Sequence, residues 1–265
     1  MATLTDPARE LSEIAARLTV GSGSNGAAFL ADQFGVESWS TEFMKIIVCI
    51  MERADLVARI VRQSDLDDDH KDKAIEHLTT FKTGFVGGSL GSHWNTAGQG
   101  LTIMKDHGSP IQFLSQTVRP FVKYPKLTDE ETTELIQLID TYLSEVSKSD
   151  EGPAFVRQAI IDGLTMFRFQ LEKLGWMGSG YALAAFREVV AVYEMSQREF
   201  ASDGTLDAEA VLRGFSGILT SFKKKVDEAK GWKDAAENVW NFYSIASSVA
   251  TPLLLTGHLP ALPSP

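Results

Sequence analysis

The sequence predicts a mainly α-helical protein: an irregular multi-helix bundle around a central helical hairpin at about residues 153–200, with no substantial sheet. Two observations indicate this fold class. Apolar residues recur at spacings of three and four along nearly every segment, which is the period of an amphipathic helix. No segment alternates apolar and polar residues convincingly over the length of a strand, and no internal repeat has the period of a solenoid.

The central hairpin is indicated by two apolar stripes on either side of a glycine-containing break at 175–180. The stripe before the break consists of Val156, Ile160, Phe167, Leu171 and Leu174, and the stripe after it of Leu183, Phe186, Val190 and Tyr193. Gly175 is a natural helix end, because glycine accepts the left-handed conformation that terminates a helix. Both halves also carry apolar residues off the stripe. A helix that is apolar on more than one side is usually surrounded, so we expect the hairpin near the centre of the fold.

Capping residues and glycines place the helix boundaries in the N-terminal part of the chain. Asp6 and Pro7 are the residue types of a helix cap and a first helical position. A glycine-rich loop at 21–26 separates this first helix from a short helix at 27–34. A long helix follows from about residue 40 to residue 61, with apolar residues in steps of three and four. We therefore expect three helices before residue 62.

The middle of the chain contains its least regular stretch, the glycine-rich residues 84–108. A helix at 73–81 precedes this stretch, and a short helix that begins at 109–110 follows it. Thr128 and Glu131 then have the spacing of a capping box, which predicts the start of another helix.

The domain prediction is one helical bundle domain at 1–222, whose last helix opens after residue 203. A lysine-rich connector, an apolar C-terminal helix and a proline-rich tail follow at 223–265. We expect this C-terminal part to dock on the same domain, because Val239, Phe242, Ala246 and Val249 form one apolar face of the last helix.

Composition excludes several classes of protein. The net charge of −10 and a pI near 5.0 argue against nucleic acid as a partner. Cys49 is the single cysteine, which excludes an internal disulfide and a cysteine-built zinc site, and its apolar neighbours favour an inert buried thiol. The N-terminus has acidic residues where a secretory signal needs a basic start and an apolar run, so we expect a cytoplasmic protein.

Two glycine motifs match functional patterns without the context that gives them meaning. Residues 21–26 match the dinucleotide-binding pattern G-x-G-x-x-G, but a helix and not a strand precedes them. Residues 87–91 match the G-x-S-x-G nucleophile elbow, with Ser89 as nucleophile and His93, His107 and His258 as conceivable bases. The elbow also requires a preceding strand and a parallel sheet, so both motifs are interpreted as loops.

The acidic run from Asp65 resembles an incomplete EF-hand in its spacing. Loop positions 1, 3, 5 and 12 would be Asp65, Asp67, Asp69 and Glu76. His70 replaces the glycine that makes the sharp turn, so we interpret the aspartates as the cap of a helix. His70 and His77 are seven residues apart, which is too far for one metal ion. The prediction is no metal and no organic cofactor.

The C-terminal segment has the order of a membrane anchor. A lysine-rich flank at 223–233 precedes the aromatic and apolar residues Trp240, Tyr243, Leu253, Leu254 and Leu255. Against a membrane span, Asn, Ser and Thr residues and Pro252 interrupt the about 20 apolar residues that a span requires. The alternative interpretation is an amphipathic last helix that docks on the bundle.

These patterns favour a non-enzymatic helical interaction or regulatory protein that binds a protein partner or a copy of itself. The second hypothesis is a membrane-acting effector, toxin-like or defence-like, with a peripheral or tail-anchored C-terminal segment. The third is a hydrolase with its site in the 84–108 region, because catalytic groups favour loops on a rigid scaffold.

Overall fold

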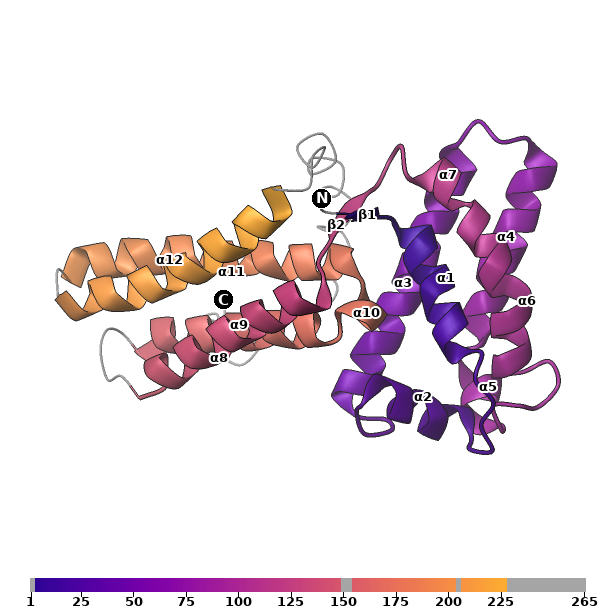
Figure 1. Cartoon of the computed structure of the whole chain (residues 1–265), viewed down its shortest axis with the longest axis horizontal. Helices are drawn as coiled ribbons and strands as arrows, with labels where there is room; N and C mark the ends of the chain where they lie inside the picture. Colours follow the sequence, from indigo (N-terminus) through magenta and orange to yellow (C-terminus); the bar gives the residue numbers. More distant parts are fainter. Residues whose placement is uncertain (1–2, 149–153, 204–205, 228–265) are drawn as a thin grey trace, which may run out of the picture.

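The structure, a computed structural model, describes residues 3–148, 154–203 and 206–227. These residues form a mainly α-helical protein with one small two-stranded sheet, which confirms the predicted fold class (Figure 1). The helices are arranged in two lobes that lie side by side, one built from the N-terminal half of the chain and one from the C-terminal half.

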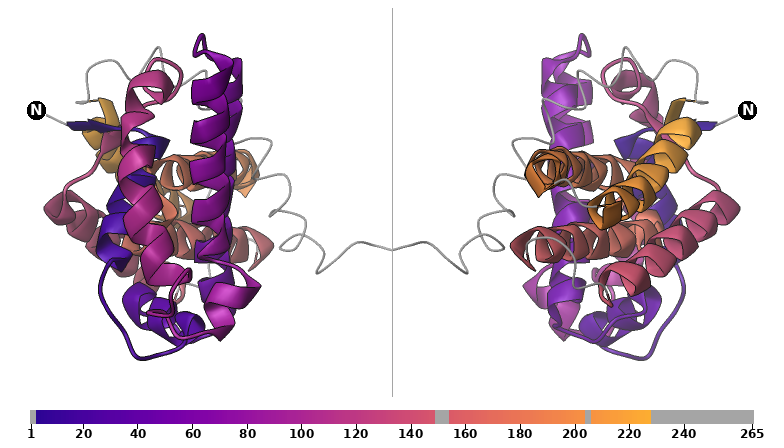
Figure 2. Two further views of the ribbon diagram at one scale, coloured as in Figure 1. Left: turned by 90° about the vertical axis from the view of Figure 1, so that its right-hand side faces the viewer. Right: turned by 90° about the vertical axis from the view of Figure 1, so that its left-hand side faces the viewer.

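The N-terminal lobe consists of α1 (Pro7–Leu18), α2 (Gly26–Phe34), α3 (Thr41–Gln63), α4 (Asp68–Thr83), α5 (Gly87–Gly91), α6 (Gly100–Phe113) and α7 (Ser115–Val118). Four of these helices surround its core: α6 packs between α1 and α4, and α3 packs against both α1 and α4. The left view of Figure 2 shows α4 and α6 side by side. The short helices α2 and α5 contact each other at one end of this lobe.

The C-terminal lobe is a four-helix bundle of α8 (Asp129–Val146), α9 (Ala154–Glu172), α11 (Ser179–Asp203) and α12 (Leu206–Asp227). Each helix packs against the next around the bundle, and α12 closes it against α8. The predicted hairpin is present as α9 and α11, but the predicted helix end at Gly175 was wrong, because α9 ends at Glu172 and Gly175 lies inside the short α10 (Leu174–Met177) that joins them. The α10 end of the hairpin contacts α3 and α1, so the hairpin connects the two lobes.

The sheet pairs β1 (Thr3–Thr5) antiparallel with β2 (Tyr124–Lys126), with Leu4 opposite Pro125. The chain passes through β2 on its way from α7 to α8, so the sheet lies between the two lobes (Figure 1).

The predicted helix caps are confirmed in their hydrogen bonds. The Asp6 side chain accepts hydrogen bonds from the amides of Ala8 and Arg9, both at 3.1 Å. Thr128 and Glu131 form the full capping box at the start of α8. These side chains satisfy amides that a helix N-terminus leaves without an intrahelical partner.

The prediction of an irregular stretch up to residue 108 was wrong, because α6 already begins at Gly100 and contains Pro110. Two of its glycines permit close packing rather than a loop. A Cβ atom on Gly108 would lie 2.5 Å from the Cβ of Ala15 on α1, and one on Gly100 would lie 2.1 Å from the Trp94 ring. Glycine is therefore required where α6 crosses its neighbours.

The predicted boundary at 222/223 falls inside α12, which continues through the three lysines to Asp227. The Lys225 ammonium group lies 2.8 Å from a carboxylate oxygen of Glu134 on α8, so this part of the lysine-rich segment belongs to the bundle. The predicted apolar helix and proline-rich tail lie outside the described residues.

A core prediction follows for Phe167, which is fully buried against Phe222, with 5.1 Å between the ring centroids. Phe167→Ala should lower the free energy of unfolding by about 3–5 kcal/mol, because it removes apolar burial and leaves a cavity. Phe155→Ala, on the same helix but 61% exposed, should change it by less than about 0.5 kcal/mol. Urea denaturation measures both. Equal losses in the two variants would contradict the observed packing.

Candidate functional site

The tip of the hairpin is held against the N-terminal lobe by a buried arginine and a buried glutamate. Arg53 on α3 donates through Nη2 to the carbonyl oxygens of Trp176, at 2.8 Å, and Met177. Glu10 on α1 accepts a hydrogen bond from the Ser179 amide at 3.0 Å, at the start of α11. We call these five residues the interlobe joint. It connects α1 and α3 to the turn between α10 and α11.

Gly178 makes this approach possible. Its φ of 96° is a conformation that side chains rarely adopt, and it lies between the two carbonyls that Arg53 binds and the amide that Glu10 binds. A Cβ atom on Gly178 would lie 2.5 Å from the Arg53 Cζ and 2.6 Å from the Glu10 Oε2. The backbone can therefore meet both charged groups only if residue 178 is glycine.

The charges of the joint are nearly removed from water. Arg53 is 1% exposed, and its Nη1 lies 3.4 Å from the Glu10 Oε2 in an ion pair. Burial raises the pKa of Glu10 above its ordinary value, while the Arg53 charge and the Ser179 amide oppose that rise. Because each charge is buried with the other as its counter-ion, loss of either one would leave the other buried without compensation.

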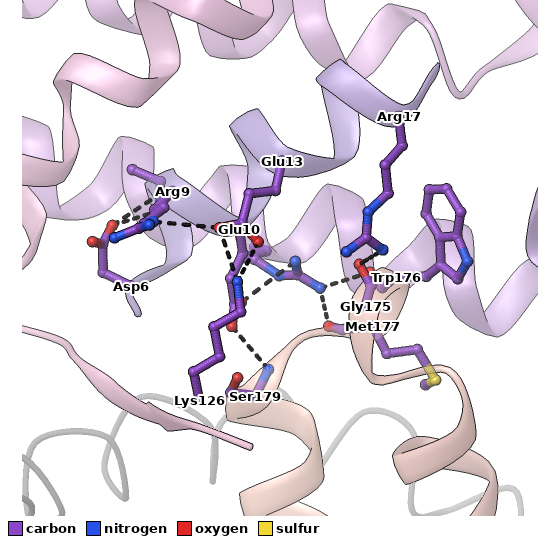
Figure 3. Close-up of polar contacts among 12 residues, drawn as sticks. Asp6, Arg9, Glu10, Glu13, Arg17, Lys126, Gly175, Trp176, Met177 and Ser179 are labelled. Atoms are coloured by element: carbon purple, nitrogen blue, oxygen red, sulfur yellow. Dashed lines mark hydrogen bonds and ion pairs between the residues drawn. The ribbon is translucent and has the colours of Figure 1, made fainter. Parts of the chain in front are cut away.

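A second ring of polar contacts surrounds the joint (Figure 3). Arg17 donates to the Gly175 carbonyl at 3.2 Å and lies over the Trp176 ring, 5.3 Å from its centroid. Lys126 on β2 binds both carboxylate oxygens of Glu13 at 2.9 and 3.0 Å. Thus α1 contacts the hairpin and the sheet as well as its own lobe.

The candidate nucleophile Ser89 is buried on α5, where its hydroxyl donates to the side-chain oxygen of Gln99 at 3.0 Å. Two of the candidate bases are engaged elsewhere. His93 Nδ1 lies 2.6 Å from the Gly23 carbonyl oxygen, and His107 faces His77. The third, His258, lies outside the described residues. The structure therefore does not bring Ser89 and a histidine together among the residues it describes.

The glycine motif at 21–26 spans the turn from α1 to α2. Asn25 caps α2 and accepts a hydrogen bond from the Ala28 amide at 2.8 Å. The Ser22 amide donates to Asn95 at 2.9 Å, and the Ser24 amide donates to the Ser22 hydroxyl at 3.1 Å. These donors are already used within the protein, whereas a phosphate loop directs its amides at a ligand.

The acidic run lies at the start of α4. Asp67 is the N-cap and accepts a hydrogen bond from the His70 amide at 3.0 Å, which lowers the pKa of the Asp67 carboxyl. Asp69 is in the first turn, Glu76 lies two turns further on, and Asp65 precedes the cap. Within the described ranges, no three or more His, Cys, Asp or Glu side chains are grouped so that they could hold a metal ion.

Cys49 is buried on α3, as predicted, and burial raises the pKa of its thiol to about 12. A thiol that stays protonated at neutral pH is a poor nucleophile. The possible membrane segment, with Trp240, Tyr243 and Leu253 to Leu255, lies outside the described residues. Within the part of the chain that the structure describes, no helix has the length and apolar character needed to cross a bilayer.

One edge of the N-terminal lobe exposes large apolar side chains that the sequence interpretation did not single out. Trp39 is 60% exposed, Met44 43% and Val48 45%, and Met51 continues the same side of α3 half-buried. We call these four residues the α3 edge. Trp39 also has a φ of 64°, and within the described residues it is the one non-glycine residue with a positive φ. A positive φ is an outlier for a bulky side chain.

The interlobe joint yields a stability prediction. Arg53→Met should lower the free energy of unfolding by about 3–5 kcal/mol, because it leaves Glu10 buried without its counter-ion. A matched control is Lys82→Met, which removes the more exposed ion pair of Lys82 with Asp55, also between α3 and another helix. That change should cost at most about 1 kcal/mol. Urea denaturation that gave both variants the same loss would rule out a special role for the joint.

The chain was compared with family models, with curated proteins and with solved structures. None of the three comparisons found a match. Its function is therefore inferred from the geometry of its own residues, and above all from the joint that fixes the lobes and from the apolar edge that remains exposed.

Proposed function

We propose that the protein is a non-enzymatic helical interaction module that binds a protein partner through the α3 edge. The observation that supports this proposal is the line of exposed apolar side chains along one helix. Met44 and Val48 are four residues apart, and Met51 follows three residues later, so all three lie on the same side of α3. Trp39 precedes the start of this helix and is 60% exposed. Tryptophan is among the residue types that contribute most to binding energy at protein interfaces.

Trp39 contacts the core on one side only, because its ring centroid lies 5.8 Å from that of the buried Phe43. A residue in its place, just before the Ser40 cap, often packs on the fourth helical residue, here Met44, and fixes the entry of the chain into the helix. Such a contact should shield both side chains, yet both remain substantially exposed. Beyond its contact with Phe43, the indole of Trp39 remains 60% exposed on a strained backbone, and unusual backbone conformations of this kind are concentrated at functional sites.

Charge favours a basic partner over a second copy of the chain. Glu37 and Glu42 are exposed on either side of Trp39, and the whole chain carries a net charge of −10. Two copies would repel each other, whereas a partner with basic residues beside its apolar face would be attracted. An amphipathic helix with basic flanks fits this description, because one helical face can present apolar anchors at spacings of three and four.

The decisive variant is Trp39→Gly, because it separates binding from folding. Glycine adopts a positive φ freely, which offsets the lost contact with Phe43, so the free energy of unfolding should stay within about 1 kcal/mol of the wild-type value. Loss of the indole ring should nevertheless weaken partner binding by at least about 30-fold. Thermal and urea unfolding measure the first effect. The second is measured by titration with a purified partner that was first captured on the wild-type chain.

Phe113→Ala is the control for the binding measurement, since Phe113 is the most exposed large apolar side chain described and lies at the far end of α6. It should leave the affinity unchanged. Val48→Ser should weaken binding in the same direction as Trp39→Gly. A partner that binds the Trp39→Gly and Val48→Ser variants as tightly as the wild type would refute the α3 edge as the docking surface.

A further inference from the structure

Two histidines from different helices of the N-terminal lobe meet head-on. The Nδ1 of His77 on α4 lies 2.9 Å from the Nδ1 of His107 on α6. The ring centroids are 5.1 Å apart, with 61° between the ring planes. This centroid separation is close to the nitrogen–nitrogen distance plus the two ring radii, so each Nδ1 points at the other. Both rings are half-buried at the contact between the helices that stand side by side in Figure 2.

When two imidazole nitrogens point at each other at hydrogen-bonding distance, only one proton can lie between them. In the neutral pair one ring donates its Nδ1–H, and the other accepts it at Nδ1 and keeps its own proton on Nε2. Protonation of the acceptor ring is possible only at its Nδ1, so it places two N–H groups face to face and breaks the hydrogen bond. The interaction therefore depends on at least one ring remaining neutral at Nδ1.

The charged neighbours modify this balance. Burial and the charge of His77 lower the pKa of His107, while Asp106 on the same helix and Glu76 on α4 raise it by smaller amounts. On the other packed elements, α1 meets α6 through Ala15 at Gly108, and α3 meets α4 through the ion pair of Asp55 with Lys82.

We infer that His77 and His107 form an acid-sensitive clamp, which holds α4 against α6 while they share one proton and weakens when both rings are protonated. The alternative to a shared proton is that the two imidazoles bind a metal ion together. The head-on geometry opposes it, because ligands of one ion direct their lone pairs at a common point beside the nitrogen–nitrogen line. Also, no third His, Cys, Asp or Glu in the described residues joins the pair to make a metal-binding group. The inference is independent of the proposed partner-binding role.

The direction of the pH effect follows from linkage. Because the pKa of His107 is lower in the folded protein, the unfolded chain binds more protons as the pH falls below the ordinary histidine value of about 6.5. Stability from the clamp is therefore fully present above that pH. It is progressively lost as the pH falls toward the pKa of His107 in the folded protein.

Long-range proton–nitrogen NMR spectra of the histidine rings test the shared proton directly. At pH 7.5 one ring of the pair should be protonated at Nδ1 and the other at Nε2. On acidification the His107 ring should titrate below about pH 6.5. Two rings that both carry their proton on Nε2, or that titrate independently with ordinary values, would overturn the inference.

Thermal unfolding of the full chain tests the clamp itself. His77→Gln keeps a hydrogen-bonding group but cannot be protonated, so its unfolding midpoint should fall by about 2–4 °C less than that of the wild type between pH 7.5 and 5.0. His70→Gln, at an exposed histidine on the same helix, should show the full wild-type fall. If His77→Gln fails to fold, His107→Gln serves in its place.

Equal falls of the unfolding midpoint in all variants would overturn the clamp. Stabilisation of the wild type alone by added Zn²⁺ would also overturn it in favour of a metal site.

Discussion

The arrangement of the two lobes is fixed most directly by a buried ion pair of the N-terminal lobe, Arg53 with Glu10, which binds the backbone of the turn between α10 and α11. Removing two charges from water is costly, and here the cost is offset by the mutual attraction of the charges and by hydrogen bonds to backbone groups of residues 176, 177 and 179. Apolar packing alone tolerates sliding, whereas these bonds are directional. They fix where the hairpin tip sits on α1 and α3.

The same helix carries the joint and the proposed docking surface. Met44 and Arg53 are nine residues apart, which is two and a half helical turns, so they lie on opposite sides of α3. The side with Arg53 is buried against the hairpin, and the side with Met44 faces solvent. A partner bound at the α3 edge would therefore contact a helix whose other side is fixed to the second lobe. The proposed docking surface would then be supported by both lobes.

The sequence was sufficient for the elements that depend on local patterns. The stripe through Phe167, the cap at Asp6 and the capping box at Thr128 all reappear in the structure, because each involves residues within a few positions of one another. Contacts between distant segments could not be predicted. Arg53 stands within the apolar run of α3, where periodicity gives no sign of a partner 123 residues away. The pairing of His77 with a residue on α6, and the glycine that lets α6 pack closely on α1, likewise require knowledge of which helices are neighbours.

The most direct test of the central claim is a double-mutant cycle on the joint, with Glu10→Gln, Arg53→Met and the combined variant unfolded in urea. If the two charged groups bind the hairpin turn as one buried pair, the losses will not add. The combined variant will be more stable than the sum of the single losses implies, by about 1–3 kcal/mol. Losses that add to within about 0.5 kcal/mol would mean that the two residues act independently. The buried pair would then not be the unit that holds the hairpin turn.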